Sequence, residues 1–131
     1  MERYITFESN IEKIIESLEG KVKDKIIASK DITEFVDSVI KTAFTKRASD
    51  IHIEPLENQV RIRYRVDGEL ITVTSAEKEK QAQIIGRLKA ISNMHQEKQI
   101  SQDGRILLYP DYNIRVSSQK NVYGEKFVLR L

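Results

Sequence analysis

With 131 residues, the chain is long enough for one domain with a buried core. Hydrophobic residues make up 40% of the sequence and charged residues 32%, proportions that exclude a membrane-embedded chain and a disordered one. The sequence has no Cys, which excludes disulfides and thiolate chemistry, and its formal net charge of +2 is too small to indicate a nucleic-acid or membrane partner.

The N-terminal part of the sequence carries two helical patterns. Apolar residues at steps of three and four predict a helix within residues 1–30; they are Ile11, Ile14, Ile15, Leu18, Val22 and Ile26. A firmer helix is expected over residues 32–46. Its start is predicted at Asp31, because this carboxylate can cap the free amides of the first turn and Glu34 completes a capping box.

After Ser49 the hydrophobic period switches to two, which predicts three strands. The first covers residues 51–54, the second covers 60–66, and the turn at Asp67-Gly68 returns the chain as a third strand over 69–73. On the second strand we expect a buried set under the helices and an exposed set on the opposite face. The buried set is Ile62, Tyr64 and Val66, and the exposed set is Arg61, Arg63 and Arg65.

The C-terminal half repeats this layout. Apolar residues at helical spacing predict a second core helix over residues 77–94. A polar loop at 102–104 then leads into three expected strands over 105–109, 112–118 and 126–131, joined by turns at 109–112 and 121–124. We therefore predict an α+β fold, an antiparallel sheet with helices packed on one face.

Several kinds of chemistry are excluded or disfavoured. The five glycines are isolated and none lies in the phosphate-binding motif G-x-x-x-x-G-K-[ST], so the chain is not by itself a P-loop ATPase. His52 and His95 belong to no metal-ligand motif, so no metal site is expected, and we interpret His52 as a hydrogen-bonded structural residue. No apolar run is long enough for a transmembrane helix and no signal peptide is recognisable, which predicts a cytoplasmic location.

Two groups of arginines could bind phosphate. Arg61, Arg63 and Arg65 form one row on a strand face, where guanidinium groups can hold phosphate oxygens, although a solvated face balanced by nearby acids is the simpler interpretation. Arg115 and Arg130 occupy polar positions in two later strands. On composition alone, the same simple interpretation applies to them.

Four ordered segments carry a resemblance to a known family. They are RASDIHIEP at 47–55 with RIRYRVDG at 61–68, QDGRI at 102–106, RVSS at 115–118, and GEKFVLRL at 124–131. Together they closely resemble the opening of the conserved core in type II secretion and type IV pilus assembly ATPases. Residues 31–131 look like the second N-terminal domain of such an ATPase, a PAS-like module that precedes the P-loop domain. Residues 1–30 are interpreted as the lead-in from an upstream domain.

The resemblance has local departures. Ser101 stands where the family usually has a proline before Gln-Asp-Gly, Gln99 replaces an expected basic residue, and residues 109–112 replace a glycine-containing turn. These differences concern loop contacts and leave the expected fold unchanged.

The resemblance also implies a function. In the family, this domain closes over ATP and Mg²⁺ held by the P-loop domain, and two arginines reach the terminal phosphate; by motif these are Arg115 and Arg130 here, with Arg105 as a weaker candidate. The implied partners are the P-loop domain of the same parent chain, neighbouring subunits of a hexamer, and the secretion or pilus platform at the inner membrane, without membrane insertion. No hydrolysis is expected from this chain alone.

Two other functions are weighed against this one. A nucleic-acid module would use the strand from Arg61 to Arg65 but needs aromatic residues on the same face, and Tyr64 is expected on the opposite one. A PAS-like small-molecule sensor would need an apolar cavity in the core. We expect no nucleic-acid partner.

Overall fold

The structure is a computed structural model that describes residues 31–97 and 100–131. The helix predicted within residues 1–30 lies outside the described residues. So does Gln99, one of the departures from the family pattern.

Helix α2 spans Ile32–Thr45 and confirms the first predicted core helix. It begins where expected, because the Asp31 carboxylate accepts a hydrogen bond from the backbone amide of Thr33 at 2.9 Å and so satisfies one free donor of the first turn. One face of the helix is buried, through Phe35, Val36, Val39, Ile40, Thr42 and Ala43. Except for Thr42, these are apolar residues at helical spacing.

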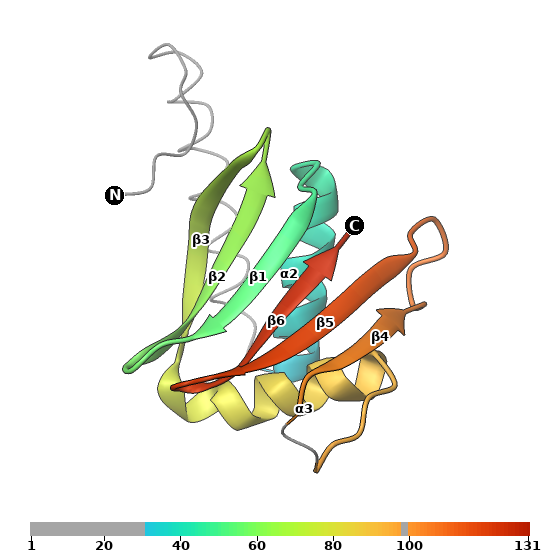
Figure 1. The fold of residues 1–131 in the computed structure, drawn as a ribbon. Helices are drawn as coiled ribbons and strands as arrows, with labels where there is room; N and C mark the ends of the chain where they lie inside the picture. The colour runs from blue at the N-terminus through green and yellow to red at the C-terminus, as the bar shows by residue number, and fades with distance from the viewer. Residues whose placement is uncertain (1–30, 98–99) are drawn as a thin grey trace, which may run out of the picture.

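Six strands form one antiparallel sheet in the order β3-β2-β1-β6-β5-β4 (Figure 1). The strands are β1 (Asp50–Pro55), β2 (Gln59–Val66), β3 (Glu69–Glu77), β4 (Gln102–Ile106), β5 (Ile114–Asn121) and β6 (Gly124–Arg130). Each half of the chain contributes three neighbouring strands. The halves meet at β1 and β6, which pair in the middle of the sheet.

Helix α3 spans Gln81–Ile91, shorter than the predicted range of 77–94. The chain first continues β3 to Glu77 and then makes a short 3₁₀ helix, η1, at Lys78–Lys80. The prediction ended β3 at residue 73, but residues 74–77 still pair with β2 across an irregularity at Ile62 and Arg63. Pairing with β2 therefore overrides the weak strand propensity of this segment.

The later strands also begin and end differently from the prediction. β4 occupies Gln102–Ile106, so the predicted polar loop at 102–104 is part of a strand, and residues 107–113 connect it to β5. Each β4 residue pairs with β5, from Gln102 opposite Ser118 to Ile106 opposite Ile114. Cross-strand pairing thus holds a segment in strand conformation that its composition does not favour.

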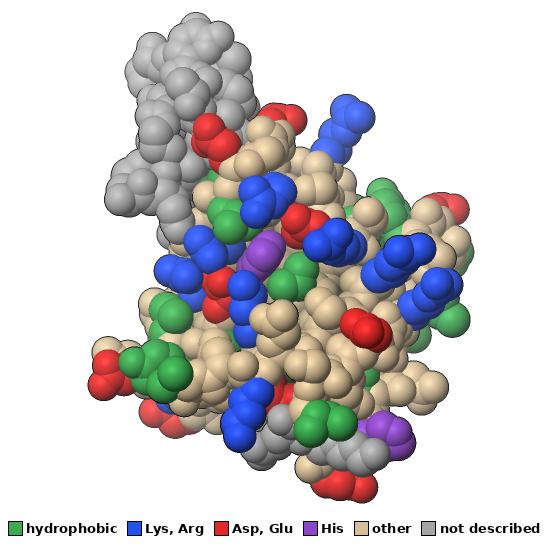
Figure 2. Space-filling view, viewed as in Figure 1, with side chains coloured by type: hydrophobic (Ala, Val, Ile, Leu, Met, Phe, Trp, Pro, Cys, Tyr) green, Lys and Arg blue, Asp and Glu red, His purple; other side chains and the backbone are tan. Residues whose placement is uncertain are grey.

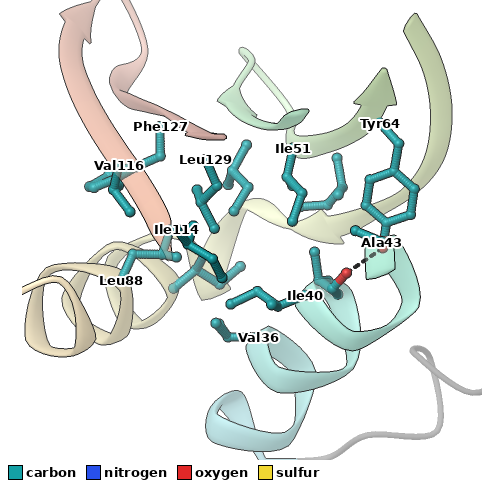
Figure 3. Close-up of a cluster of buried hydrophobic side chains, with 14 of the residues drawn as sticks. Val36, Ile40, Ala43, Ile51, Tyr64, Leu88, Ile114, Val116, Phe127 and Leu129 are labelled. Carbon is teal, nitrogen blue, oxygen red and sulfur yellow. Dashed lines mark hydrogen bonds between the residues drawn. The ribbon is translucent and has the colours of Figure 1, made fainter. Parts of the chain in front are cut away.

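The core lies between one face of the sheet and both helices (Figure 3). Side chains alternate along each strand, so Ile51, Tyr64, Ile114, Phe127 and Leu129 are fully buried on the inner face. The Tyr64 hydroxyl donates a hydrogen bond to the carbonyl of Val39 in α2, and this pairing satisfies the one polar atom of the ring inside the core. The opposite face of the sheet carries no helix among the described residues (Figure 1). None of the described helices is both long enough and apolar enough to cross a membrane.

Candidate functional site

A single row of charged side chains crosses the open face of the sheet. Arg105 on β4 lies directly opposite Arg115 on β5, and Arg115 lies opposite Arg130 on β6. The row continues to β1, where Asp50 faces Arg130, and then to β2, where Arg65 faces Asp50. Alternation along each strand explains this arrangement, because each of these five residues is adjacent in sequence to a buried residue of the core.

We call Arg105, Arg115 and Arg130 the arginine ladder. All three side chains are exposed, and within the described part of the chain none of them has a hydrogen bond or ion pair. They border a shallow, open hollow of about 560 Å³ on the sheet surface. Figure 2 shows this open face, on which basic side chains gather over the sheet. The ladder therefore presents three guanidinium groups to solvent.

The arginines of β2 are engaged differently. Glu54 on β1 accepts hydrogen bonds from Arg63 at 2.7 Å through both Nε and a terminal nitrogen, and from Arg61 Nε at 3.1 Å. Lys126 Nζ lies 3.4 Å from the same carboxylate. Arg65 donates from Nε to Asp50 at 3.1 Å. These arginines are half-buried, not exposed as the sequence predicted, because the acids draw them onto the sheet.

The basic neighbours of Glu54 change its acidity. Burial by itself would raise the pKa of this carboxyl, but the hydrogen bonds and charges of Arg63 and Arg61 outweigh burial and lower its pKa from 4.5 to about 2. Glu54 is therefore ionised at neutral pH, and Arg61 and Arg63 share its single negative charge. The simple interpretation of Arg61, Arg63 and Arg65, a face balanced by acids, agrees with this geometry.

The arginine ladder lacks such a balance. Like charges directly opposite each other on neighbouring strands destabilise a sheet, and here two such contacts follow one another, Arg105 with Arg115 and Arg115 with Arg130. An anion placed over the ladder would relieve the repulsion and could accept hydrogen bonds from more than one guanidinium group. Phosphate oxygens fit this donor set, since the planar fork of arginine binds them through two parallel hydrogen bonds.

The surroundings of the ladder do not form a metal site. Within residues 31–97 and 100–131 no group of three or more His, Asp or Glu side chains could hold a metal ion. Asp103 lies on the rim of the hollow, opposite Ser117, and Asp50 is already bonded to Arg65. These residues do not fit Mg²⁺ as an ion bound by this chain alone.

His52 lies on the same open face, one row further along β1, between Arg63 on β2 and Val128 on β6. Burial and the nearby Lys126 lower its pKa, so the imidazole is predominantly neutral near pH 7. Its Nδ1 atom is buried without a hydrogen-bond partner among the described residues. The expectation that hydrogen bonds hold this histidine is therefore wrong for Nδ1. His95 contributes only backbone atoms to contacts, with the side chain of Gln102.

The structure brings together Arg105, Arg115 and Arg130, the three arginines to which the family resemblance assigns phosphate contacts. Arg115 and Arg130 lie on neighbouring strands and outside buried salt bridges, and Arg105 belongs to the same row. Sequence reasoning missed Asp50 and Glu54. The signal was present in the alternation of Asp50, His52 and Glu54 with buried residues, which places both acids on the face of the arginines.

Comparisons with known proteins agree with this picture. The family model for "Type II/IV secretion system protein" matches residues 27–131. Type II secretion system protein E of Xanthomonas campestris pv. campestris is 37% identical over 130 residues, which cover 90% of this chain and 23% of the relative. The type IV pilus assembly ATPase PilB of Thermus thermophilus is 40% identical over 102 residues, covering 75% of this chain and 12% of the relative. PilB of Acinetobacter baylyi is 36% identical over 113 residues, which cover 82% of this chain and 20% of the relative.

The chain spans less than a quarter of the length of these relatives. The match of the family model nevertheless covers every described residue, including the whole sheet and the arginine ladder. The chain therefore belongs to the type II/IV secretion system protein family.

Proposed function

We propose that this chain is the domain of a secretion or pilus assembly ATPase that closes over ATP held by a P-loop domain. In this proposal Arg115 and Arg130 contact the terminal phosphate, and Arg105 at the end of the row is a third, weaker contact. The domain does not hydrolyse ATP by itself. It works in the cytoplasm, in a hexamer that acts on a platform at the inner membrane.

One observation carries the proposal. Of the six arginines on the open face named above, the three on β2 are bonded to Glu54 or Asp50, while the three of the ladder have no partner within the described residues. The ladder arginines are exposed and lie opposite one another although their like charges repel. Such an arrangement is suited to binding an external anion. The relatives supply the context, since two of those named above are type IV pilus assembly ATPases.

The chemistry follows from the properties of the guanidinium group. Hydrolysis of ATP, with Mg²⁺, develops charge on the oxygens around the bond that breaks. Arg115 and Arg130 are permanently charged and project from rigid neighbouring strands, so they can approach these oxygens without reorganising the sheet. Such residues act like an arginine finger. Because the ladder lies on an open face, closure of the domain against the nucleotide would complete the site.

The test is ATP hydrolysis by the full-length ATPase that carries this sequence. Arg115→Ala and Arg130→Ala each remove charge-assisted hydrogen bonds worth roughly 1.5–3 kcal/mol, so turnover should fall about tenfold to a hundredfold. Lysine at either position should restore little, because it keeps the charge and loses the bidentate fork. Arg105→Ala should have the smaller effect.

Lys120→Ala is the matched control. Lys120 is an exposed cation on β5, away from the ladder, so its removal changes the net charge of the domain by the same amount. Turnover should then stay near the wild-type value. Wild-type turnover in both alanine variants, with assembly intact, would show that Arg115 and Arg130 are ordinary surface residues.

A nucleic-acid-binding function is less well supported. Single-stranded nucleic acids are bound by basic grooves in which bases stack on aromatic side chains. Tyr64, the aromatic residue of β2, is fully buried on the opposite face, as the sequence predicted. A small-molecule sensor would need space in the core, where side chains of the sheet and both helices pack as one cluster.

A further inference from the structure

Asp50 is the one carboxylate in the row that contains the arginine ladder, and it stands between two arginines. Arg130 faces it from β6 and Arg65 faces it from β2, both in direct cross-strand register. Side chains that are paired in this way have Cβ atoms about 4.5–5.5 Å apart, which is well within the reach of either arginine. Asp50 nevertheless bonds to Arg65, whose Nε lies 3.1 Å from Oδ2, while Arg130 has no partner within the described part of the chain.

The turn after β2 explains why Asp50 bonds to Arg65 and not to Arg130. Arg65 also donates from a terminal nitrogen to the carbonyl of Gly68 at 2.9 Å, so the two ends of its guanidinium group are fixed at once. The carbonyl is in place because Asp67 and Gly68 adopt positive φ angles of 51° and 83° in the tight turn to β3. Arg65 is therefore pre-organised to occupy Asp50. Arg130 has no comparable anchor.

We propose that Arg65 is a positioning residue that occupies Asp50 and so keeps Arg130 available for a phosphate group. The inference rests on the proposed function of the ladder and adds a residue from the other half of the sheet to it. If Arg65 is removed, no other donor competes with Arg130 for the Asp50 carboxylate, which lies directly opposite it. Arg130 then pairs with Asp50, and a phosphate group must displace this internal carboxylate before it can bind.

The first measurement needs no ligand. In the wild-type chain, the Nε–H signal of Arg130 in ¹H–¹⁵N NMR spectra should exchange rapidly with water, as expected for a solvated guanidinium group. In Arg65→Gln the signal should become protected and shift toward a hydrogen-bonded position. In the double variant Arg65→Gln with Asp50→Asn it should return to the wild-type behaviour, because the charged acceptor is gone.

The second measurement is a titration of the chain with inorganic tripolyphosphate at low salt. Arg65→Gln should weaken binding by about two- to fivefold, the range expected when an exposed ion pair competes with the ligand. Arg61→Gln is the matched control, because it removes one charge from the same strand and face without touching Asp50. In the Asp50→Asn background, Arg65→Gln should weaken tripolyphosphate binding no more than Arg61→Gln does.

The outcomes separate this inference from the proposed function. An unchanged Arg130 signal in Arg65→Gln, or a loss of affinity no larger than in Arg61→Gln, would overturn the positioning role. If Arg115→Ala leaves tripolyphosphate binding unaltered, the proposed function loses its support. The NMR comparison still tests the role of Arg65 in that case, because it is made without any phosphate.

Discussion

Replacing Glu54 with glutamine tests the electrostatic account of the open face most directly. The carboxylate is 8% exposed and accepts three hydrogen bonds from Arg61 and Arg63, with Lys126 nearby. Glutamine has nearly the same shape but offers one uncharged acceptor oxygen, and its amide group would point donors at the guanidinium groups. Arg63, whose side chain is 18% exposed, would lose its counter-ion.

The lowered pKa of Glu54 sets the expected loss of stability in Glu54→Gln. A fall from 4.5 to about 2 means that the folded protein stabilises the ionised form by roughly 3 kcal/mol at neutral pH. Glu54→Gln should therefore lower the free energy of unfolding at pH 7 by about 2–3 kcal/mol, since part of the carboxylate remains in contact with water. For a domain of this size, such a loss lowers Tm by roughly 10 °C.

The sign of the pH dependence gives a second check. Because the pKa of Glu54 is lower in the folded state, its stabilising contribution is present above about pH 4.5 and is lost as the pH falls toward 2. The difference in unfolding free energy between wild type and Glu54→Gln should shrink over this interval. Urea unfolding followed by circular dichroism at several pH values measures it.

Glu57→Gln is the matched control, because Glu57 is an exposed carboxylate in the turn after β1, three positions further along the chain. Its unfolding free energy should stay within about 0.5 kcal/mol of wild type. A difference between wild type and Glu54→Gln that is below about 0.5 kcal/mol at pH 7, or equally large near pH 2, would refute the reasoning.

Two further predictions concern packing beneath the sheet. Lys89 and Glu125 form a buried ion pair at 2.8 Å, so Lys89→Met alone should destabilise the domain by about 3–5 kcal/mol, whereas Lys89→Met combined with Glu125→Leu should recover most of the loss in a urea-based double-mutant cycle. A double variant as unstable as Lys89→Met alone would contradict this prediction. A Cβ atom on Gly104 would lie 2.4 Å from the carbonyl oxygen of Ser92, so Gly104→Ala should cost roughly 1–3 kcal/mol in thermal unfolding. Gly86→Ala, where the added atom meets ordinary contacts in a helix, should be neutral or stabilising by up to about 1 kcal/mol, and equal Tm values in the two variants would argue against the clash.

The faces of the sheet could be predicted from the sequence because alternation is a local property. Arg115 lies between Ile114 and Val116, so a strand at this position has one possible orientation relative to the core. The same argument places Arg130 beside the buried Leu129. The six strands, the two core helices and the outward direction of the arginine ladder all followed from such patterns.

The pairing of distant strands could not be predicted in this way. Alternation tells which face Asp50 occupies, but not that Arg130, about 80 positions later, lies opposite it. The limits of β4 were missed for a related reason. Asp103 and Gly104 are poor strand formers, and only contacts with β5 hold them in the sheet. The ion pairs of Glu54 depend on the same long-range geometry.

The meeting of β1 and β6 in the middle of the sheet also has a consequence for how the domain folds. Every other strand pairing joins segments that are close in sequence and can form early as hairpins, whereas the pairing of β1 with β6 must close a loop of roughly 80 residues. Until β1 pairs with β6, the three strands that carry the ladder have Arg115 and Arg130 side by side with no acid directly opposite either of them. Asp50 comes to lie opposite Arg130 only when β1, in the N-terminal half of the sheet, pairs with β6. The chain must therefore assemble its most repulsive surface before the partner strand is in place, which makes the pairing of β1 with β6 the natural candidate for the slow step of folding.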